Sequence, residues 1–263
     1  MVDFGLNGTI ALVTGGASGI GLACARWMAD RGCSVVIADR DEAAADPAAR
    51  EISAVPYTLD IRDKERVEAV VADIEVRLGP IGILVNCAGV LQNPLPPDQL
   101  TMKEWDLVTA VNLRGTYVMC SSVGSRMAGR RNGSIVNIGS VAALRPGPLH
   151  AYGPAKAAVI ALTESLAAEW GRCGVRVNAV SPGFTHTPAV AKSFEHKILS
   201  QAKLTDATAL GRLVDPAEIA AAVGFLASPL ASAITGINLT VDAGYLVACA
   251  WQSYGGPQSE HGQ

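Results

Sequence analysis

Short runs of apolar residues alternate with amphipathic stretches along most of the chain. The apolar runs are four to six residues long and rich in β-branched side chains, which is typical of strands. Strands are predicted at Thr9–Val13, Ser34–Ala38, Val55–Leu59, Ile81–Val85, Ser134–Ile138, Val175–Val180 and Asn238–Val241. Strands that are apolar on both faces indicate a parallel sheet covered by helices.

The stretches between these runs have helical spacing. Helices are predicted at Ile20–Arg31, Arg62–Leu78, Thr101–Met127, Tyr152–Trp170 and Pro216–Ala227. In the second of these, Val67, Val71 and Ile74 fall on one side, as a helix against a sheet requires. Asp41–Ser53 is rich in alanine and contains a proline, so it predicts only a short or irregular helix.

This alternation predicts a single α/β domain over residues 1–263. Right-handed crossovers would build a doubly wound, Rossmann-like parallel sheet of about seven strands with helices on both faces. A substrate loop is expected at about 185–206. The C-terminal tail, about 245–263, is unusually apolar at first and polar from Ser253 on. We expect its apolar part to pack at a subunit interface or over a substrate cleft, and its end to be disordered unless a partner holds it.

Composition excludes several classes of function. Nearly half of the residues are hydrophobic (49%), 17% are charged, and the net charge of −3 leaves no basic excess for nucleic acid. The start lacks a secretory signal, and no apolar run approaches the ~20 residues of a membrane span. The six cysteines are scattered and the histidines lack ligand spacing, so we expect no metal and a cytoplasmic location.

A glycine-rich turn follows the first predicted strand. Gly15 permits a tight turn, and Gly19 and Gly21 allow a pyrophosphate to approach the start of the next helix. Asp39 ends the second strand, where a carboxylate can bind the adenine ribose hydroxyls and repel a 2′-phosphate. We therefore predict NAD rather than NADP, although Arg40 could welcome the phosphate. The alternatives are a ligand-free turn and an Asp39 that caps the next helix.

Tyr152 and Lys156 stand four residues apart, on one face of a predicted helix. A phenol has a pKa of about 10, and a close ammonium favours its ionised form. Lowering that pKa by about 3 units requires roughly 4 kcal/mol of differential interaction. Alone, the pair also fits a partly buried tyrosine beside a solvated lysine.

Together these motifs resemble the short-chain dehydrogenase/reductase family over essentially the whole chain. The matching features are Thr-Gly-x3-Gly-x-Gly at Thr14–Gly21, Asn-x-Ala-Gly at Asn86–Gly89, a helical Asn112, Ser140 after the fifth strand, Tyr152 with Lys156, Pro182-Gly183, and Thr187. Enoyl reductases of this family space the tyrosine and lysine more widely, so the sequence does not match that branch of the family.

The resemblance implies a role for each matching residue. Tyr152 would be the catalytic acid/base, Ser140 would hydrogen-bond the substrate oxygen, and Lys156 would lower the tyrosine pKa and hold the nicotinamide ribose. Asn112 would steady a water that links Lys156 to solvent. The implied cofactor-binding residues are Gly15, Ser18, Gly19, Ile20, Gly21, Asp39, Asp60, Ile61, Asn86, Ala88, Gly89, Tyr152, Lys156, Pro182, Gly183 and Thr187.

Three positions depart from the family pattern. Cys87 replaces a frequent second Asn, and Ser140 precedes Tyr152 by 12 residues, one fewer than is most common. Pro154 is tolerated only in a first helical turn, so we predict that the helix begins within about three residues of Tyr152.

The sequence thus predicts an NAD-dependent oxidoreductase that interconverts a secondary alcohol, such as a polyol or sugar, and a ketone. The alternatives are an NADPH-dependent 3-oxoacyl reductase and, less favoured, a non-catalytic cofactor-sensing protein on the same fold. The resemblance also implies a homodimer or homotetramer, with an interface at Thr101–Met127 and Tyr152–Trp170.

Overall fold

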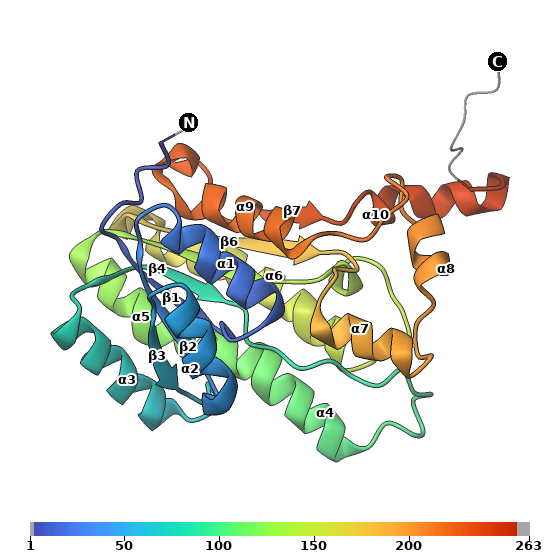
Figure 1. The fold of residues 1–263 in the computed structure, drawn as a ribbon, viewed down its shortest axis with the longest axis horizontal. Coiled ribbons are helices and arrows are strands. Elements are labelled where there is room, and N and C mark those ends of the chain that lie inside the picture. The colour runs from blue at the N-terminus through green and yellow to red at the C-terminus, as the bar shows by residue number, and fades with distance from the viewer. Residues whose placement is uncertain (1–2, 257–263) are drawn as a thin grey trace.

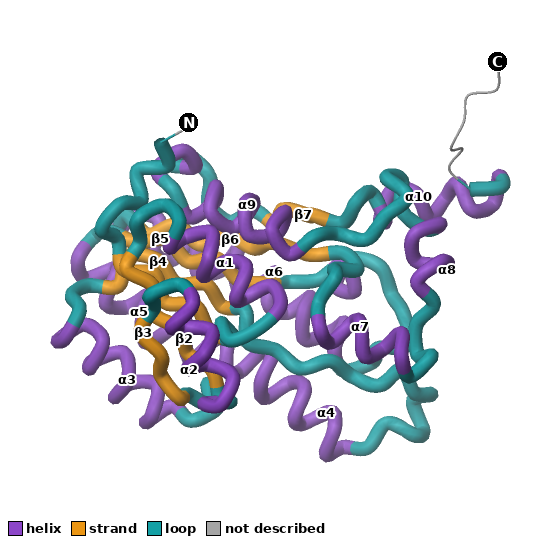
Figure 2. Tube along the Cα trace, in the orientation of Figure 1, coloured by secondary structure: helices purple, strands orange, loops and turns teal. Residues whose placement is uncertain are grey.

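A parallel sheet of seven strands forms the centre of the molecule (Figures 1 and 2), as the sequence predicted. The computed structural model describes residues 3–256. The strands are β1 Ile10–Thr14, β2 Ser34–Asp39, β3 Val55–Thr58, β4 Ile81–Asn86, β5 Gly133–Ile138, β6 Val175–Pro182 and β7 Asn238–Val241. Their order is β3-β2-β1-β4-β5-β6-β7, and every neighbouring pair is parallel. The strand order reverses between β1 and β4, which is where doubly wound sheets bind ligands.

Helices cover both faces of this sheet. One face carries α1 Gly19–Ala29, α2 Glu42–Glu51 and α9 Pro216–Ala227. The other carries α3 Lys64–Arg77, α5 Thr116–Arg130 and α6 Tyr152–Trp170. The shorter α-helices are α4 Met102–Thr109, α7 Pro188–Glu195, α8 Gln201–Asp206 and α10 Tyr245–Ala248. The segment η1 Ala110–Gly115 is a π-helix. Short 3-10 helices are η2 Val141–Ala143, η3 Gly171–Cys173, η4 Pro229–Ala231 and η5 Cys249–Tyr254.

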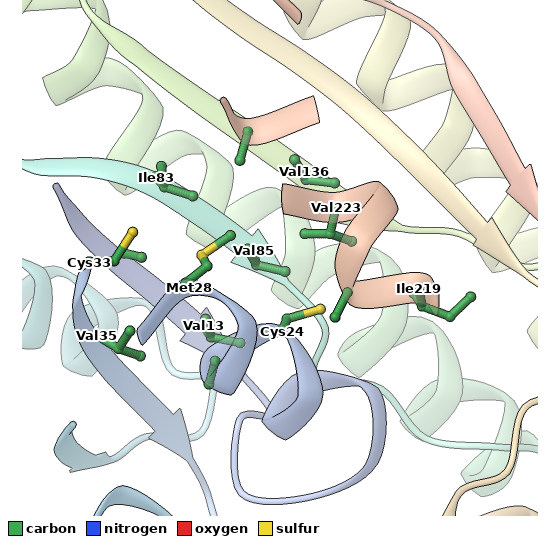
Figure 3. Close-up of a cluster of buried hydrophobic side chains, with 14 of the residues drawn as sticks. Val13, Cys24, Met28, Cys33, Val35, Ile83, Val85, Val136, Ile219 and Val223 are labelled. Atoms are coloured by element: carbon green, nitrogen blue, oxygen red, sulfur yellow. The ribbon is translucent and has the colours of Figure 1, made fainter. Parts of the chain in front are cut away.

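The core between the sheet and α1 shows why these segments fold as they do. Val13 and Val85 project from neighbouring strands toward Cys24 and Met28 of α1, and α9 adds Val223 (Figure 3). Alternate residues of each strand point to the opposite face and bury against the other helices. Burial on both faces explains why the strands are apolar throughout.

Two predicted elements differ in the structure. Asp41–Ser53 forms a ten-residue helix, because the Asp41 side chain accepts the Ala44 N–H and the alanines pack against the core. The helix predicted at Thr101–Met127 is interrupted by the π-helical segment η1, which separates α4 from α5.

The prediction for the start of α6 is confirmed. The helix begins at Tyr152, so Pro154 lies in its first turn, where a missing N–H costs no helical hydrogen bond.

The C-terminal segment leaves the body of the molecule (Figure 1). Tyr245 packs edge-on against Phe184, with 5.3 Å between ring centroids. Val247 and Trp251 are exposed in this single chain. The polar end predicted to be disordered lies partly beyond the described residues. No helix among residues 3–256 is long and apolar enough to span a bilayer.

Candidate active site

A cleft of about 690 Å³ lies at the carboxyl ends of the strands, where the strand order reverses. Thr14 joins its two sides: its hydroxyl at the end of β1 accepts the N–H groups of Cys87 and Ala88, each at 3.2 Å, just after β4. This link fixes the turn after β1 against the turn after β4, so both turns shape one groove.

The glycines after β1 are required by this geometry. Gly15 has φ of +63°, and a Cβ there would lie 2.7 Å from the Ala88 Cα. A Cβ on Gly21 would lie 2.1 Å from the Gly15 carbonyl oxygen. The following helix begins after Ser18, whose side chain makes no capping hydrogen bond. Gly19, Ile20 and Gly21 at the start of this helix line the cleft, where uncapped N–H groups suit a pyrophosphate, so this turn fits a dinucleotide.

Asp39 and Asp60 also line the groove. The Asp39 carboxylate accepts the N–H of Ala17 at 3.2 Å and that of Asp41 at 3.1 Å, which ties it to the glycine turn. The guanidinium of Arg62 donates hydrogen bonds to both carboxylate oxygens of Asp60 and thereby holds the pKa of that carboxyl below its usual range. Asp60 therefore stays ionised, with Arg62 beside it in the lining.

Most residues predicted to bind the cofactor line this cleft. They are Gly15, Ser18, Gly19, Ile20, Gly21, Asp39, Asp60, Ile61, Ala88, Gly89, Tyr152, Lys156, Pro182, Gly183 and Thr187.

Asn86 is not among the residues that line the cleft. Its side chain is buried between the sheet and the helices, where Nδ2 donates to Asn137 Oδ1 at 2.9 Å and approaches the Cys120 sulfur. Asn137 in turn donates to the hydroxyl of Thr163 on α6 at 2.9 Å. Asn86 therefore joins the ends of β4 and β5 to α6 instead of lining the cleft.

Tyr152, Ser140 and Lys156 meet at the inner end of the cleft. Tyr152 is the first residue of α6, and Ser140 follows β5, where its hydroxyl also accepts the Ala142 N–H at 3.1 Å. The Lys156 ammonium is buried and donates to the carbonyl of Ile138 at 2.7 Å. It lies 5.8 Å from the centre of the Tyr152 ring. The end of β5 thus supplies the Ile138 carbonyl that holds the lysine, and the serine follows two residues later.

The ionisation of this group differs from the sequence-based expectation. Burial raises the pKa of Tyr152 above its ordinary value, and the hydrogen bond with Ser140 lowers it in part. Burial also lowers the pKa of Lys156, to about 8. The expected lowering of the tyrosine pKa by Lys156 is therefore not seen in the chain alone, because desolvation dominates and the ammonium is directed at the Ile138 carbonyl.

Asn112 lies in the π-helical segment and is fully buried. Its Oδ1 accepts the Val90 N–H at 3.0 Å, and its Nδ2 donates to the Val90 carbonyl at 2.9 Å. A Cβ on Gly89 would lie 2.8 Å from Asn112 Oδ1 and 3.8 Å from Lys156 Nζ, so the glycine separates the two side chains. Because Val90 uses both ends of the amide, the structure gives Asn112 a direct part in fixing the backbone after β4.

The lining also includes residues that sequence reasoning did not single out, among them Gln92 and Arg145, and it includes Tyr245 from the C-terminal segment that was expected to pack at an interface or over a substrate cleft. Arg145 donates to the carbonyl of Leu246 at 3.3 Å and so ties the cleft wall to the C-terminal segment. The segment predicted as the substrate loop supplies further lining from α7 and the turn that follows it, including Ser193, Ile198 and Leu199. Gln92 and Arg145 belong to no recognisable motif, so the sequence offered no signal for these two residues.

The fold and the cleft define a nicotinamide-dependent oxidoreductase, and the chain belongs to the short-chain dehydrogenase/reductase family. A family model described as enoyl-(acyl carrier protein) reductase matches residues 15–246. With that membership, the protein is an NAD(P)-dependent enzyme of the alcohol dehydrogenase/ketone reductase type.

Individual relatives match nearly the whole chain. Galactitol 2-dehydrogenase (L-tagatose-forming) from Cereibacter sphaeroides is 42% identical, over 93% of this chain and 97% of its own. D-threitol dehydrogenase from Mycolicibacterium smegmatis is 39% identical, over 93% of this chain and 95% of its own. A solved structure described as ribose-5-phosphate isomerase from Brucella melitensis 16M is 56% identical, with a TM-score of 0.94 over 96% of this chain and 98% of that one.

Proposed function

We propose that the protein is an NAD-dependent dehydrogenase that oxidises a secondary hydroxyl of a polyol to a ketone, and reduces the ketone in reverse. The observation that carries this proposal is that Ser140, Tyr152 and Lys156 line the same cleft as the glycine turn and Asp39. Relatives described as galactitol, D-threitol and glycerol dehydrogenases support the polyol class.

The chemistry divides between cofactor and protein. The nicotinamide, when bound, accepts or supplies the hydride. The protein must hold the alcohol and move its proton. Ser140 and Tyr152 can share the substrate oxygen between them, with the serine hydroxyl polarising it and the phenolate form of Tyr152 taking its proton during oxidation to become the phenol.

Lys156 supports this proton transfer from the next turn of α6. Its pKa of about 8 keeps the ammonium mostly charged at neutral pH, despite burial. A charge 5.8 Å from the centre of the Tyr152 ring would favour the phenolate relative to the phenol, although in the chain alone burial outweighs it and keeps the pKa of Tyr152 above its ordinary value. Asn112 acts in this scheme through Val90, by fixing the backbone beside Lys156.

NAD is the proposed cofactor because of Asp39. Two backbone N–H groups hold its carboxylate in the wall of the cleft, where it would accept the adenine ribose hydroxyls. A 2′-phosphate in the same place would meet a fixed negative charge.

The second candidate is an NADPH-dependent 3-oxoacyl reductase. A relative described as 3-oxoacyl-[acyl-carrier-protein] reductase from Thermotoga maritima, 36% identical over 92% of this chain, favours it. Arg40 and Arg62 also line the cleft, and their positive charges would attract a 2′-phosphate. The fixed position of Asp39 supports the first candidate over this one. A non-catalytic sensor is least favoured, since the catalytic residues are all present.

A substrate screen tests these alternatives. The purified protein is supplied with NAD or NADP and with galactitol, threitol, glycerol or xylitol, and reduced cofactor is followed by its absorbance. The reverse reaction is tried with NADPH and an acetoacetyl thioester, and ribose 5-phosphate is tested without cofactor for conversion to a ketose. Turnover of a polyol with NAD supports the proposal. Turnover of only the thioester, or only the sugar phosphate, would reject it.

We also propose a cytoplasmic homodimer or homotetramer. Free thiols at Cys24, Cys33, Cys87, Cys120 and Cys173 suit a reducing compartment. Tyr117 on α5 and Trp251 near the C-terminus are exposed aromatic side chains, as expected where a second copy covers them. Sedimentation of the wild type and of Trp251→Ser measures the assembly, and a monomeric wild type would reject it.

A further inference from the structure

The start of α6 lacks the usual means of satisfying its backbone. A helix begins with N–H groups that have no partner within the helix. Here the residue before the helix is Ala151, whose side chain cannot cap. Pro154 has no N–H, and the Gly153 N–H donates to the Leu149 carbonyl at 2.9 Å. The N–H groups of Ala151 and Tyr152 therefore need an acceptor from another part of the chain.

Gln92 supplies that acceptor from 60 residues away. Its Oε1 accepts the Ala151 N–H at 2.7 Å and the Tyr152 N–H at 3.1 Å. Both partners are donors, which identifies the facing atom as the amide oxygen. The Nε2 donates to the carbonyl of Asn93 at 3.2 Å, which fixes the orientation of the amide. Gln92 is only 5% exposed, so water is a poor substitute for it.

The opposite side of the helix start is closed by the Ser140 loop. A Cβ on Gly153 would lie 3.0 Å from the carbonyl oxygen of Ala142, which stands two residues after Ser140 and donates its N–H to the serine hydroxyl. The first turn of α6 therefore contacts two other parts of the chain, the loop that carries Ser140 and the side chain of Gln92.

The segment that carries Gln92 is itself anchored. Val90, two residues earlier, is held at both its N–H and its carbonyl by Asn112. An unbroken chain of contacts thus runs from the buried Asn112 through Val90 and Gln92 to the backbone of Tyr152. Fixing the backbone of the first helical residue limits where its phenol oxygen can lie relative to Ser140.

We propose that Gln92 is a positioning residue for the reaction: its amide oxygen caps α6 and thereby holds the Tyr152 phenol in register with Ser140. The proposal rests on the proposed function in so far as Tyr152 is the acid/base. Gln92 acts through the backbone of Tyr152, so it needs no contact with the substrate.

Two variants of similar size separate the acceptor from mere bulk. Gln92→Met keeps the length but removes the acceptor, and we expect kcat/KM for the alcohol to fall between about 10- and 100-fold. The KM for NAD should stay within about twofold, because the glycine turn is untouched. Gln92→Glu keeps an oxygen at the same reach, and its negative charge should raise the pKa of Tyr152. Its rate should therefore recover at higher pH.

Gln99→Met is the matched control. Gln99 lies in the same loop but is exposed, and it should keep wild-type kinetics. If Gln92→Met retains wild-type kcat/KM, the positioning role is rejected. It is equally rejected if Gln92→Glu stays as slow as Gln92→Met at every pH.

Amide hydrogen exchange tests the same contact without any substrate. Peptides that include Ala151 and Tyr152 should exchange faster in Gln92→Met than in the wild type, while Gln92→Glu and Gln99→Met should match the wild type. Unchanged exchange in Gln92→Met would overturn the cap even if activity fell. If the wild type turned over no alcohol, the proposed function would fail, but faster exchange would still support the cap.

Discussion

Replacing Asp39 by asparagine should move the cofactor preference from NAD toward NADP. The carboxylate is held by the Ala17 and Asp41 N–H groups, so it cannot easily swing away from an incoming 2′-phosphate. Two unit charges about 4 Å apart at an effective dielectric constant of about 20 repel by about 4 kcal/mol, or roughly 1000-fold. Solvent at the partly buried carboxylate reduces this effect. We therefore expect the ratio of kcat/KM with NAD to kcat/KM with NADP to decrease by a factor of about 100 to 1000 in Asp39→Asn.

The assay is steady-state turnover of one polyol with each cofactor in wild type and Asp39→Asn. Asparagine has one carbonyl oxygen, so one of the two backbone N–H groups loses its partner, at a cost of about 1 kcal/mol in the free energy of unfolding. Asp46→Asn is the control, because Asp46 lies on the adjacent helix α2, pairs with Arg50 and is outside the cleft lining. A ratio that moves equally in both variants, or in neither, would refute the reasoning.

Three further outcomes are expected. Tyr152→Phe should lose at least about 100-fold in kcat, yet it should bind NAD and unfold as the wild type does. Turnover, calorimetric titration with NAD and thermal melting measure these three properties. Retained turnover would reject the mechanism. Burial raises the pKa of Tyr152, so the phenol form prevails at neutral pH and the phenolate form increases as the pH rises. Alcohol oxidation needs the phenolate and should quicken as pH rises through neutrality, whereas ketone reduction needs the phenol and should slow. Oxidation and reduction profiles that share one pH optimum would contradict this. Gly224→Ala, whose Cβ would lie 2.1 Å from the Trp27 ring, should lower the free energy of unfolding by about 1–3 kcal/mol, whereas Gly129→Ala, with nothing within 4 Å, should not lower it.

The strands and the cleft were predictable because each depends on a local pattern. Apolar runs such as Ile81–Val85 indicate buried parallel strands, and the glycines after β1 are demanded by backbone conformations that the turn itself requires. Pro154 likewise restricted where α6 could begin. In each case a covalent property of one residue limits the structure nearby, so no knowledge of distant contacts was needed.

The rest depended on contacts between distant parts of the chain. The spacing of Tyr152 and Lys156 places them on one helix face, but it could not reveal that the ammonium would be directed at the Ile138 carbonyl. Helical periodicity could not detect the π-helical segment around Asn112, because one inserted residue leaves the apolar pattern almost intact. Gln92 was invisible for the same reason: its partner lies 60 residues away.

The order of the strands places the two halves of the groove in different halves of the chain. The glycine turn comes from the first thirty residues, whereas Ser140, Tyr152 and Lys156 come from the second half. A dinucleotide that spans the groove would therefore act as a brace between them and bind only when both are folded. At a concentration 100 times its dissociation constant, such a ligand adds about 2.7 kcal/mol to the free energy of unfolding. Cellular cofactor levels would then help determine how long the enzyme survives, as well as how fast it works.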